Sequence, residues 1–248
     1  MPQARKTQIS ISDTPYYHCM GRCVRRAFLC GEDSVSGKDY SHRKKWVTDR
    51  LRELAQSFTI EVCAYAVMSN HYHLVLKINT EKSHQLTEDD VIVRWMKLFS
   101  GNVLINRYLK GECHTGAEKE KAKEIIDEWR ERLSDISWFM RCLNESIARQ
   151  ANAEDQCTGR FWEGRFKSQA LLNEQAVLSC MVYVDLNPIR ATLSDNLEDS
   201  DFTSIQQRIT AYSNRTSKGK NRIKNKSKPV KLAGFTNGSK IRKGIPYS

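Results

Sequence analysis

Ser69-Asn70-His71-Tyr72-His73-Leu74-Val75-Leu76 is the stretch of sequence that decides the fold. Ser and Asn are common in turns, and Ser69-Asn70 lies between two apolar runs. The sequence therefore predicts a β-hairpin formed by residues 59–68 and 71–78. Residues two apart on a strand point to the same side, which places the imidazoles of His71 and His73 on one face. The opposite face carries apolar side chains that can enter a core: Tyr72, Leu74, Leu76 and Ile78.

Hydrophobic periodicity predicts the other main elements. Residues 16–24 and 165–172 are typical of strands, and residues 40–57 and 136–151 of amphipathic helices. A last helix begins at Glu174 and should end at Asn187-Pro188, because proline disfavours helical geometry in the residue before it. The order strand, helix, two strands, helix, strand, helix predicts an α+β fold, a ferredoxin-like antiparallel sheet with helices on one face.

Two segments lie outside this core. Residues 80–133 predict a helical insertion, with one helix over 91–108 capped by residues 87–90 and a charged helix over 117–133. Residues 202–248 hold 12 Lys and Arg and no Asp or Glu, whereas residues 1–201 hold 28 basic and 29 acidic residues. The net charge of +11 therefore comes from the C-terminal segment, 201–248. Its composition predicts a disordered basic tail that binds nucleic acid phosphates.

Composition also bounds the cellular location. No apolar run approaches the roughly 20 residues of a membrane span, and residues 1–14 lack the apolar region of a signal peptide. We expect a cytoplasmic protein that associates with the nucleoid and not with a membrane. Eight cysteines include no C-x-x-C pair; Cys19, Cys23 and Cys30 with His18 leave a zinc-stabilised regulator as one alternative.

His-x-His alone is a weak signal for a metal, because most such pairs are solvated or locally hydrogen-bonded. Tyr183 and Asn187 are four residues apart and so share one side of the last helix. Two neutral imidazoles with an amide oxygen form a mixed N/O site that suits Mg²⁺ or Mn²⁺ when phosphate supplies further oxygens. By pattern alone Tyr183 is more typical of a core tyrosine, and a phenol needs a metal or a base to act as a nucleophile.

Two motifs carry a family resemblance. His71-Tyr72-His73, preceded by Met68-Ser69-Asn70, resembles the His-hydrophobic-His motif of single-tyrosine (HUH) transposases. Residues 159–168 (GRFWEGRFKS) and 183–190 (YVDLNPIR) resemble the tyrosine-bearing region of the REP-associated tyrosine transposase branch. The resemblance covers roughly residues 15–80 and 134–195. Two departures are the bulky Tyr72 at a position that is usually aliphatic, and the length of the 80–133 insertion.

The resemblance implies a ferredoxin-like catalytic domain over residues 1–200, with Tyr183 as nucleophile and with His71, His73 and Asn187 as ligands of Mg²⁺ or Mn²⁺. Its helix would have to cross the histidine face of the sheet, opposite the other helices. The implied activity is cleavage and joining of single-stranded DNA at REP-like hairpins through a 5′-phosphotyrosine link. A monomer is favoured, and some relatives are dimers.

Several side chains are candidates for DNA contact, because arginine forks grip phosphates and aromatic rings stack on unpaired bases. These are Arg22, Arg25, Arg26, Arg160, Phe161, Trp162, Arg165 and Lys167, with Lys218, Lys220, Lys224, Lys226 and Lys228 in the tail. The two aromatics could equally anchor their loop in the core.

Another class of function stays open. A catalytically inactive, domesticated protein that only binds hairpin DNA would have the same fold, although its usual sign, loss of a ligand or of the tyrosine, is absent here. An RRM is disfavoured, because the aromatic RNP1 pattern does not occur. Formation of a covalent protein–DNA adduct would distinguish an enzyme from a binding protein.

Overall fold

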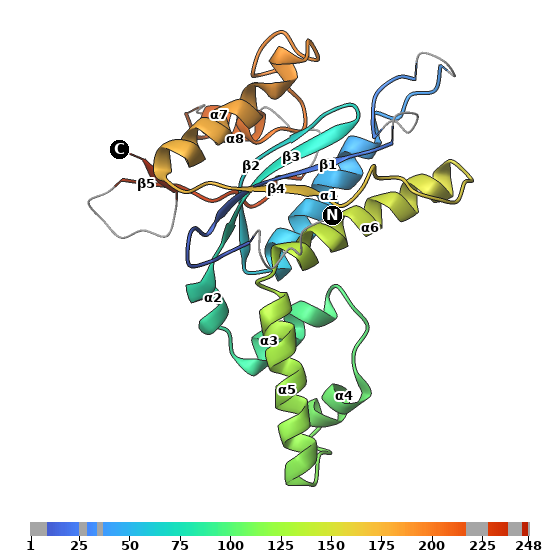
Figure 1. Ribbon diagram of the computed structural model, residues 1–248, viewed down its shortest axis with the longest axis vertical. Coiled ribbons are helices and arrows are strands. Elements are labelled where there is room, and N and C mark those ends of the chain that lie inside the picture. Colours follow the sequence, from blue (N-terminus) through green and yellow to red (C-terminus); the bar gives the residue numbers. More distant parts are fainter. Residues whose placement is uncertain (1–8, 25–28, 34–36, 217–227, 238–244, 248) are drawn as a thin grey trace.

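A four-stranded antiparallel sheet forms the centre of the molecule (Figure 1). The computed structural model describes residues 9–24, 29–33, 37–216, 228–237 and 245–247. The strands β1 (Tyr16–Arg22), β2 (Ile60–Val67), β3 (His71–Ile78) and β4 (Lys167–Ala170) pair in the order β2-β3-β1-β4. β2 and β3 form the predicted hairpin, which is closed by the Met68 N–H donating to the His71 carbonyl at 2.8 Å.

Helices cover both faces of the sheet. α1 (Arg43–Ser57) and α6 (Ile136–Glu154) pack on the face that carries Tyr72, Leu74 and Leu76. α7 (Glu174–Arg190) packs on the opposite face, where its buried residues meet Val75. The ferredoxin-like α+β fold predicted from the order of elements is therefore confirmed. No helix in the described ranges is long and apolar enough to cross a membrane.

Tyr72 fits inside the sheet because its cross-strand neighbour is a glycine. Gly21 on β1 lies directly opposite Tyr72 on β3, and a β-carbon on Gly21 would come within 2.6 Å of the Tyr72 hydroxyl oxygen. Tyr72 is fully buried, its hydroxyl donates to Asn144 of α6, and its ring meets Trp162 edge-on at 5.5 Å. The unusual tyrosine between the two histidines is thus a core residue.

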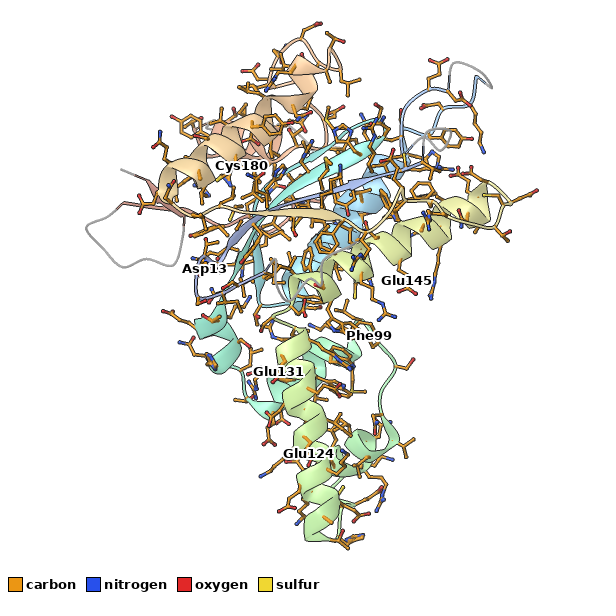
Figure 2. All side chains as sticks on the ribbon, in the orientation of Figure 1. Asp13, Phe99, Glu124, Glu131, Glu145 and Cys180 are labelled. Atoms are coloured by element: carbon orange, nitrogen blue, oxygen red, sulfur yellow. The ribbon has the colours of Figure 1, made fainter. Side chains whose placement is uncertain are left out.

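The insertion forms a helical arm that points away from α7 (Figure 1). It comprises α2 (Thr80–His84), α3 (Glu88–Met96), α4 (Val103–Leu109) and α5 (Gly116–Arg132). The single helix predicted over 91–108 is wrong: the chain breaks after α3, and Asn102 caps α4 by accepting from the Leu104 N–H at 2.8 Å. Figure 2 shows carboxylates such as Glu124 and Glu131 along the arm.

α7 does not end before its proline. It continues through Pro188 to Arg190, so the prediction of an end at Asn187-Pro188 is wrong. The proline lies in the last turn, where its missing N–H removes only one helical hydrogen bond. The Ala191 N–H still donates to the Asn187 carbonyl at 3.0 Å and closes the helix.

The described parts of the C-terminal segment are folded. α8 (Ser204–Thr216) lies beside β2, where the Ser204 hydroxyl accepts from the Tyr65 N–H at 2.9 Å. Further on, Val230 is buried and the Ala233 N–H donates to the Val62 carbonyl at 2.8 Å. The prediction of a disordered tail over all of 201–248 is wrong for these parts, because β2 offers them an unpaired edge. Short strands β5 (Phe235–Asn237) and β6 (Ile245–Tyr247) pair in parallel.

Candidate active site

Three imidazoles meet on the face of the sheet that α7 covers. The rings of His71 and His73 lie 4.8 Å apart between centroids and are nearly perpendicular, at 88°. His18 on β1 joins them: its Nε2 lies 2.9 Å from Nδ1 of His73, and the two ring centroids are 5.1 Å apart with 22° between the ring planes. Alternation along two paired central strands accounts for this cluster.

α7 brings Tyr183 to these histidines. Asn173 caps the N-terminus of the helix, because its side chain accepts from the Ala176 N–H at 2.8 Å. Buried apolar residues pack the helix against the sheet. The Tyr183 ring meets His73 edge-on at 5.6 Å and His18 at 6.2 Å, and it is 40% exposed. The structure thus meets the requirement that this helix cross the histidine face with Tyr183 toward it.

Two further polar side chains of α7 belong to this region. Asn187 follows Tyr183 by one helical turn and is 9% exposed; its side-chain amide makes no hydrogen bond with the described residues. The Arg190 guanidinium lies over the Tyr183 ring, 5.4 Å from its centroid. A partly buried amide without a protein partner is suited to bind an ion or a substrate group.

Burial keeps all three imidazoles uncharged near neutral pH. Burial, together with smaller contributions from the neighbouring His71 and His18, lowers the pKa of His73 to about 3. Burial also lowers the pKa of His71, with a contribution from Arg22, and it lowers the pKa of His18. Neutral imidazole is the form that binds a metal ion.

The hydrogen bond of His71 sets which of its nitrogens is free. Its Nδ1 lies 2.7 Å from the Asn70 side-chain oxygen, which can only accept. Nδ1 therefore carries the proton, and Nε2 keeps its lone pair. A metal-binding histidine is commonly oriented by such a hydrogen bond from its second nitrogen.

The residues at this site fit a divalent cation that takes part of its ligands from a substrate. The described ranges contain no group of three or more His, Cys, Asp or Glu side chains placed to hold a metal. An ion here would draw on two imidazoles, the Asn187 amide and oxygens from a substrate phosphate. Mg²⁺ and Mn²⁺ accept such a mixed set and keep positions open for substrate.

The alternative zinc site does not assemble. Cys19 and Cys23 face the α1 and α6 layer, whereas His18 points to the other face of the sheet. The Cys23 thiol donates to the Asn70 carbonyl at 3.1 Å and the Cys30 thiol to the Met68 carbonyl at 2.8 Å. The zinc prediction is therefore wrong.

The residues predicted to contact DNA fall into several groups. Lys167 is exposed and lies opposite Met20 in the β1–β4 pairing, on the histidine face. Arg22 is exposed at the end of β1, 3.5 Å from Glu163. Other exposed members are Arg160, Arg165 and Lys228, whereas Arg25, Arg26, Lys218, Lys220, Lys224 and Lys226 lie outside the described residues.

Phe161 and Trp162 are not available to stack on bases. They are only 4% and 8% exposed, and the Trp162 indole N–H donates to the Asn144 carbonyl at 2.8 Å. A backbone bridge between Cys23 and Trp162 fixes the loop to the end of β1. The prediction that they stack on DNA is wrong; they anchor the loop in the core.

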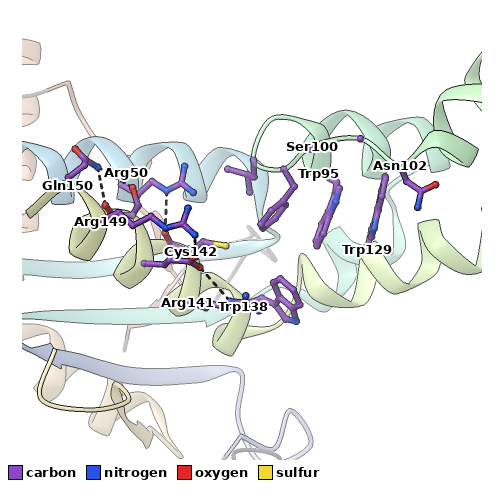
Figure 3. A pocket seen from close by; sticks show the side chains of 15 residues that line it. Arg50, Trp95, Ser100, Asn102, Trp129, Trp138, Arg141, Cys142, Arg149 and Gln150 are labelled. Atoms are coloured by element: carbon purple, nitrogen blue, oxygen red, sulfur yellow. Dashed lines mark hydrogen bonds and ion pairs between the residues drawn. The ribbon is translucent and has the colours of Figure 1, made fainter. Parts of the chain in front are cut away.

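A pocket between the arm and α6 is distinct from the histidine site (Figure 3). It lies on the α1 and α6 side of the sheet, and its aromatic wall includes Trp95 and Trp129, which stack at 5.2 Å. Arg141 and Arg149 at its rim both pair with Glu145. The pocket lies where the arm meets the body of the protein, and none of the candidate catalytic residues lines it.

Sequence reasoning missed two residues of the site, His18 and Arg190. His18 entered only as part of the rejected zinc set. Alternation along the first strand could have placed His18 on one face of the sheet. The pairing of β1 with β3, which brings His18 beside His73, cannot be read from the local sequence. Arg190 follows Tyr183 by seven residues, a helical spacing that was available from the sequence.

Comparisons with known proteins give a similarity of fold. The chain is similar to a solved structure described as a REP-associated tyrosine transposase bound to a REP hairpin, with a TM-score of 0.48 and 13% identity. The match covers 98% of this chain and 97% of the other. No family model and no curated protein matches.

Proposed function

We propose that this protein is an enzyme that nicks and joins single-stranded DNA, with the Tyr183 phenol oxygen as nucleophile. His71, His73 and Asn187 would hold Mg²⁺ or Mn²⁺ beside it. One observation carries the proposal: a partly exposed tyrosine ring lies 5.6 Å from His73, on the face that also presents His71. A nucleophile next to neutral imidazoles that can bind a cation is an arrangement suited to metal-assisted phosphoryl transfer.

The chemistry follows from these groups. A cation held by His71, His73 and Asn187 would supply Lewis acidity toward the scissile phosphate. The Tyr183 oxygen attacks phosphorus, so that an O–P bond to tyrosine forms while the bond from phosphorus to the 3′ oxygen breaks. The phenol loses its proton and the departing 3′ oxygen gains one. The products are a 5′-phosphotyrosine link and a free 3′-hydroxyl.

Joining is the reverse reaction with another strand end. A 3′-hydroxyl attacks the phosphotyrosine phosphorus, forms a new phosphodiester and returns the proton to Tyr183. The number of ester bonds to phosphorus is unchanged, so no external energy source is needed. The Arg190 guanidinium lies over the Tyr183 ring and places a positive charge at the site.

Single-stranded DNA is the substrate that the surroundings favour. α7 packs mainly on β2 and β3, and Lys167 and Gln169 of β4 are exposed beyond it on the histidine side of the sheet. Lys167 and Arg22 offer positive charge there, and the lysines of residues 218–228 add more. The hairpin as the recognised shape comes from the motif resemblance.

Incubation with labelled hairpin-containing single strands and Mn²⁺ or Mg²⁺ tests the proposal. We expect the native protein to form a covalent adduct that resists denaturation and disappears with EDTA. Tyr183→Phe should form none, because it lacks the attacking oxygen. Tyr212→Phe, at a 71% exposed tyrosine of α8, is the matched control and should react normally.

Two results would overturn the assignment. Cleavage by Tyr183→Phe would show that another group is the nucleophile. Hairpin binding by the native protein with no adduct under any metal would favour the alternative, an inactive hairpin-DNA-binding protein.

A further inference from the structure

His18 contacts a proposed metal ligand but has no role in the chemistry above. Its Nε2 lies 2.9 Å from Nδ1 of His73, and the planes of the two rings are only 22° apart, as a hydrogen bond between their edges requires. β1 is a central strand, paired with β3 on one side and β4 on the other, so the backbone position of His18 is fixed. This contact determines how His73 can bind a cation.

The contact between the two rings holds a single proton. In a hydrogen bond between two neutral imidazoles, one nitrogen is protonated and the other accepts through its lone pair. If His18 donates, His73 must carry its own proton on Nε2, and neither of its nitrogens has a free lone pair. If His73 donates from Nδ1, its Nε2 lone pair is free. Only the second arrangement makes His73 a ligand.

His71 shows the same arrangement independently. Its Nδ1 lies 2.7 Å from the oxygen of Asn70, an obligate acceptor, which leaves Nε2 free. Both histidines of the pair therefore have Nδ1 in contact with a neighbouring side chain. Asn70 is that neighbour for His71, and His18 occupies the corresponding position for His73.

We propose that His18 is a positioning residue whose Nε2 accepts the Nδ1 proton of His73 and thereby presents the Nε2 lone pair of His73 to the cation. The inference rests on the proposed function for the identity of the cation. It requires His18 to carry its own proton on Nδ1. An acceptor at this position also fixes the orientation of the His73 ring, which is worth roughly 10- to 100-fold in metal affinity at comparable sites.

The protonation state of His73 can be observed without any variant. Long-range ¹H–¹⁵N correlation spectra of the metal-free native protein distinguish a ring protonated on Nδ1 from one protonated on Nε2. We expect His73 to be protonated on Nδ1. Protonation on Nε2 would overturn the proposal, whatever the protein does to DNA.

Mn²⁺ binding to the DNA-free protein, followed by electron paramagnetic resonance of the free ion, tests the same contact energetically. His18→Leu removes the acceptor and should weaken Mn²⁺ binding by about 10- to 100-fold. His18→Gln keeps an oxygen that can accept from Nδ1 and should bind more tightly than His18→Leu. His114→Leu, at an exposed histidine of the arm, is the matched control and should bind as the native protein does.

The outcomes separate this proposal from the function on which it rests. Equal Mn²⁺ affinity of His18→Leu and the native protein, or His18→Gln binding no better than His18→Leu, would overturn the positioning role. If no Mn²⁺ binds without DNA, the spectra alone decide. A failure of Tyr183 as nucleophile changes neither measurement.

Discussion

At the scale of single residues, Tyr72 packs closely against Gly21 on the neighbouring central strand. The ring of Tyr72 occupies the space above Gly21, and its hydroxyl donates to Asn144 of α6. The contact links the strand that carries both candidate ligands to the helix layer behind it. The absence of a side chain at Gly21 is therefore a packing requirement of the site.

Gly21→Ala should destabilise the protein, because the added methyl group would lie 2.6 Å from the Tyr72 oxygen. We expect a loss of about 1–3 kcal/mol in the free energy of unfolding, measured by urea denaturation. Gly116→Ala is the control, since a β-carbon at that position meets nothing within 4 Å. The double variant Gly21→Ala/Tyr72→Leu should recover part of the loss; strictly additive losses would argue against this contact.

The residue scale is also where the sequence was most informative. The shared face of His71 and His73 follows from alternation along one strand, and the shared side of Tyr183 and Asn187 follows from one helical turn. These are local geometries that the sequence states directly. The His18–His73 contact depends instead on the register between strands that are 55 residues apart, which no local pattern specifies.

At the scale of elements, a buried arginine ties α1 to α6. Arg43 at the start of α1 is fully buried, with Nε 2.6 Å from Glu154 and Nη2 2.5 Å from Asp155 at the end of α6. Its guanidinium also lies over the Tyr40 ring at 4.1 Å. The pair of helices behind the sheet is thereby fixed at one end.

Arg43→Met should lower the free energy of unfolding by about 3 kcal/mol, because it removes the buried partner of two carboxylates and leaves them only the more exposed side chains of His42 and Lys38. Arg149→Met is the matched control on the same helix layer. The Arg149 side chain is 78% exposed in its pair with Glu145, so its removal should cost less than about 1 kcal/mol. Equal losses of stability for the two variants in urea denaturation would contradict the role of Arg43 in joining α1 to α6.

Elements were predicted best where one physical rule dominates. The order of strands and helices along the chain, the hairpin and the amphipathic helices followed from hydrophobic periodicity and from the residues typical of turns. The break between α3 and α4 and the continuation of α7 through Pro188 were missed, because tertiary packing and capping by Asn102 outweigh the local preference there. The folding of α8 and of Val230 onto β2 was missed because only the folded sheet presents that edge.

At the scale of the whole molecule, charge separates the arm from the C-terminal segment. The arm carries nearly balanced charges along α3 to α5, and it points away from the layer that holds Tyr183 (Figure 1). The excess positive charge lies beyond residue 201. DNA held near α7 would therefore draw its phosphate contacts from the C-terminal segment and from the sheet.

Replacing five tail lysines by glutamine should weaken the salt dependence of single-stranded DNA binding. The set is Lys218, Lys220, Lys224, Lys226 and Lys228. Each lysine that no longer neutralises a phosphate lowers the slope of log affinity against log salt by about 0.7, so five give up to about 3.5. The measurement is a salt titration followed by fluorescence anisotropy.

The arm supplies a control of equal charge. Glutamine at Lys97, Lys110, Lys119, Lys121 and Lys123, which are all exposed on the arm, should leave the slope unchanged. A slope that falls with the arm variant and stays with the tail variant would place the phosphate contacts on the arm.

The most direct test of the central claim is to locate the covalent bond. After reaction with hairpin single-stranded DNA and Mn²⁺, nuclease and trypsin digestion should release a peptide of residues 168–190, in which Tyr183 is the single tyrosine. We expect mass spectrometry to find a nucleotide joined through its 5′ phosphate to Tyr183. A nucleotide on Ser168, Ser179 or any other peptide, or one joined through a 3′ phosphate, would contradict the account.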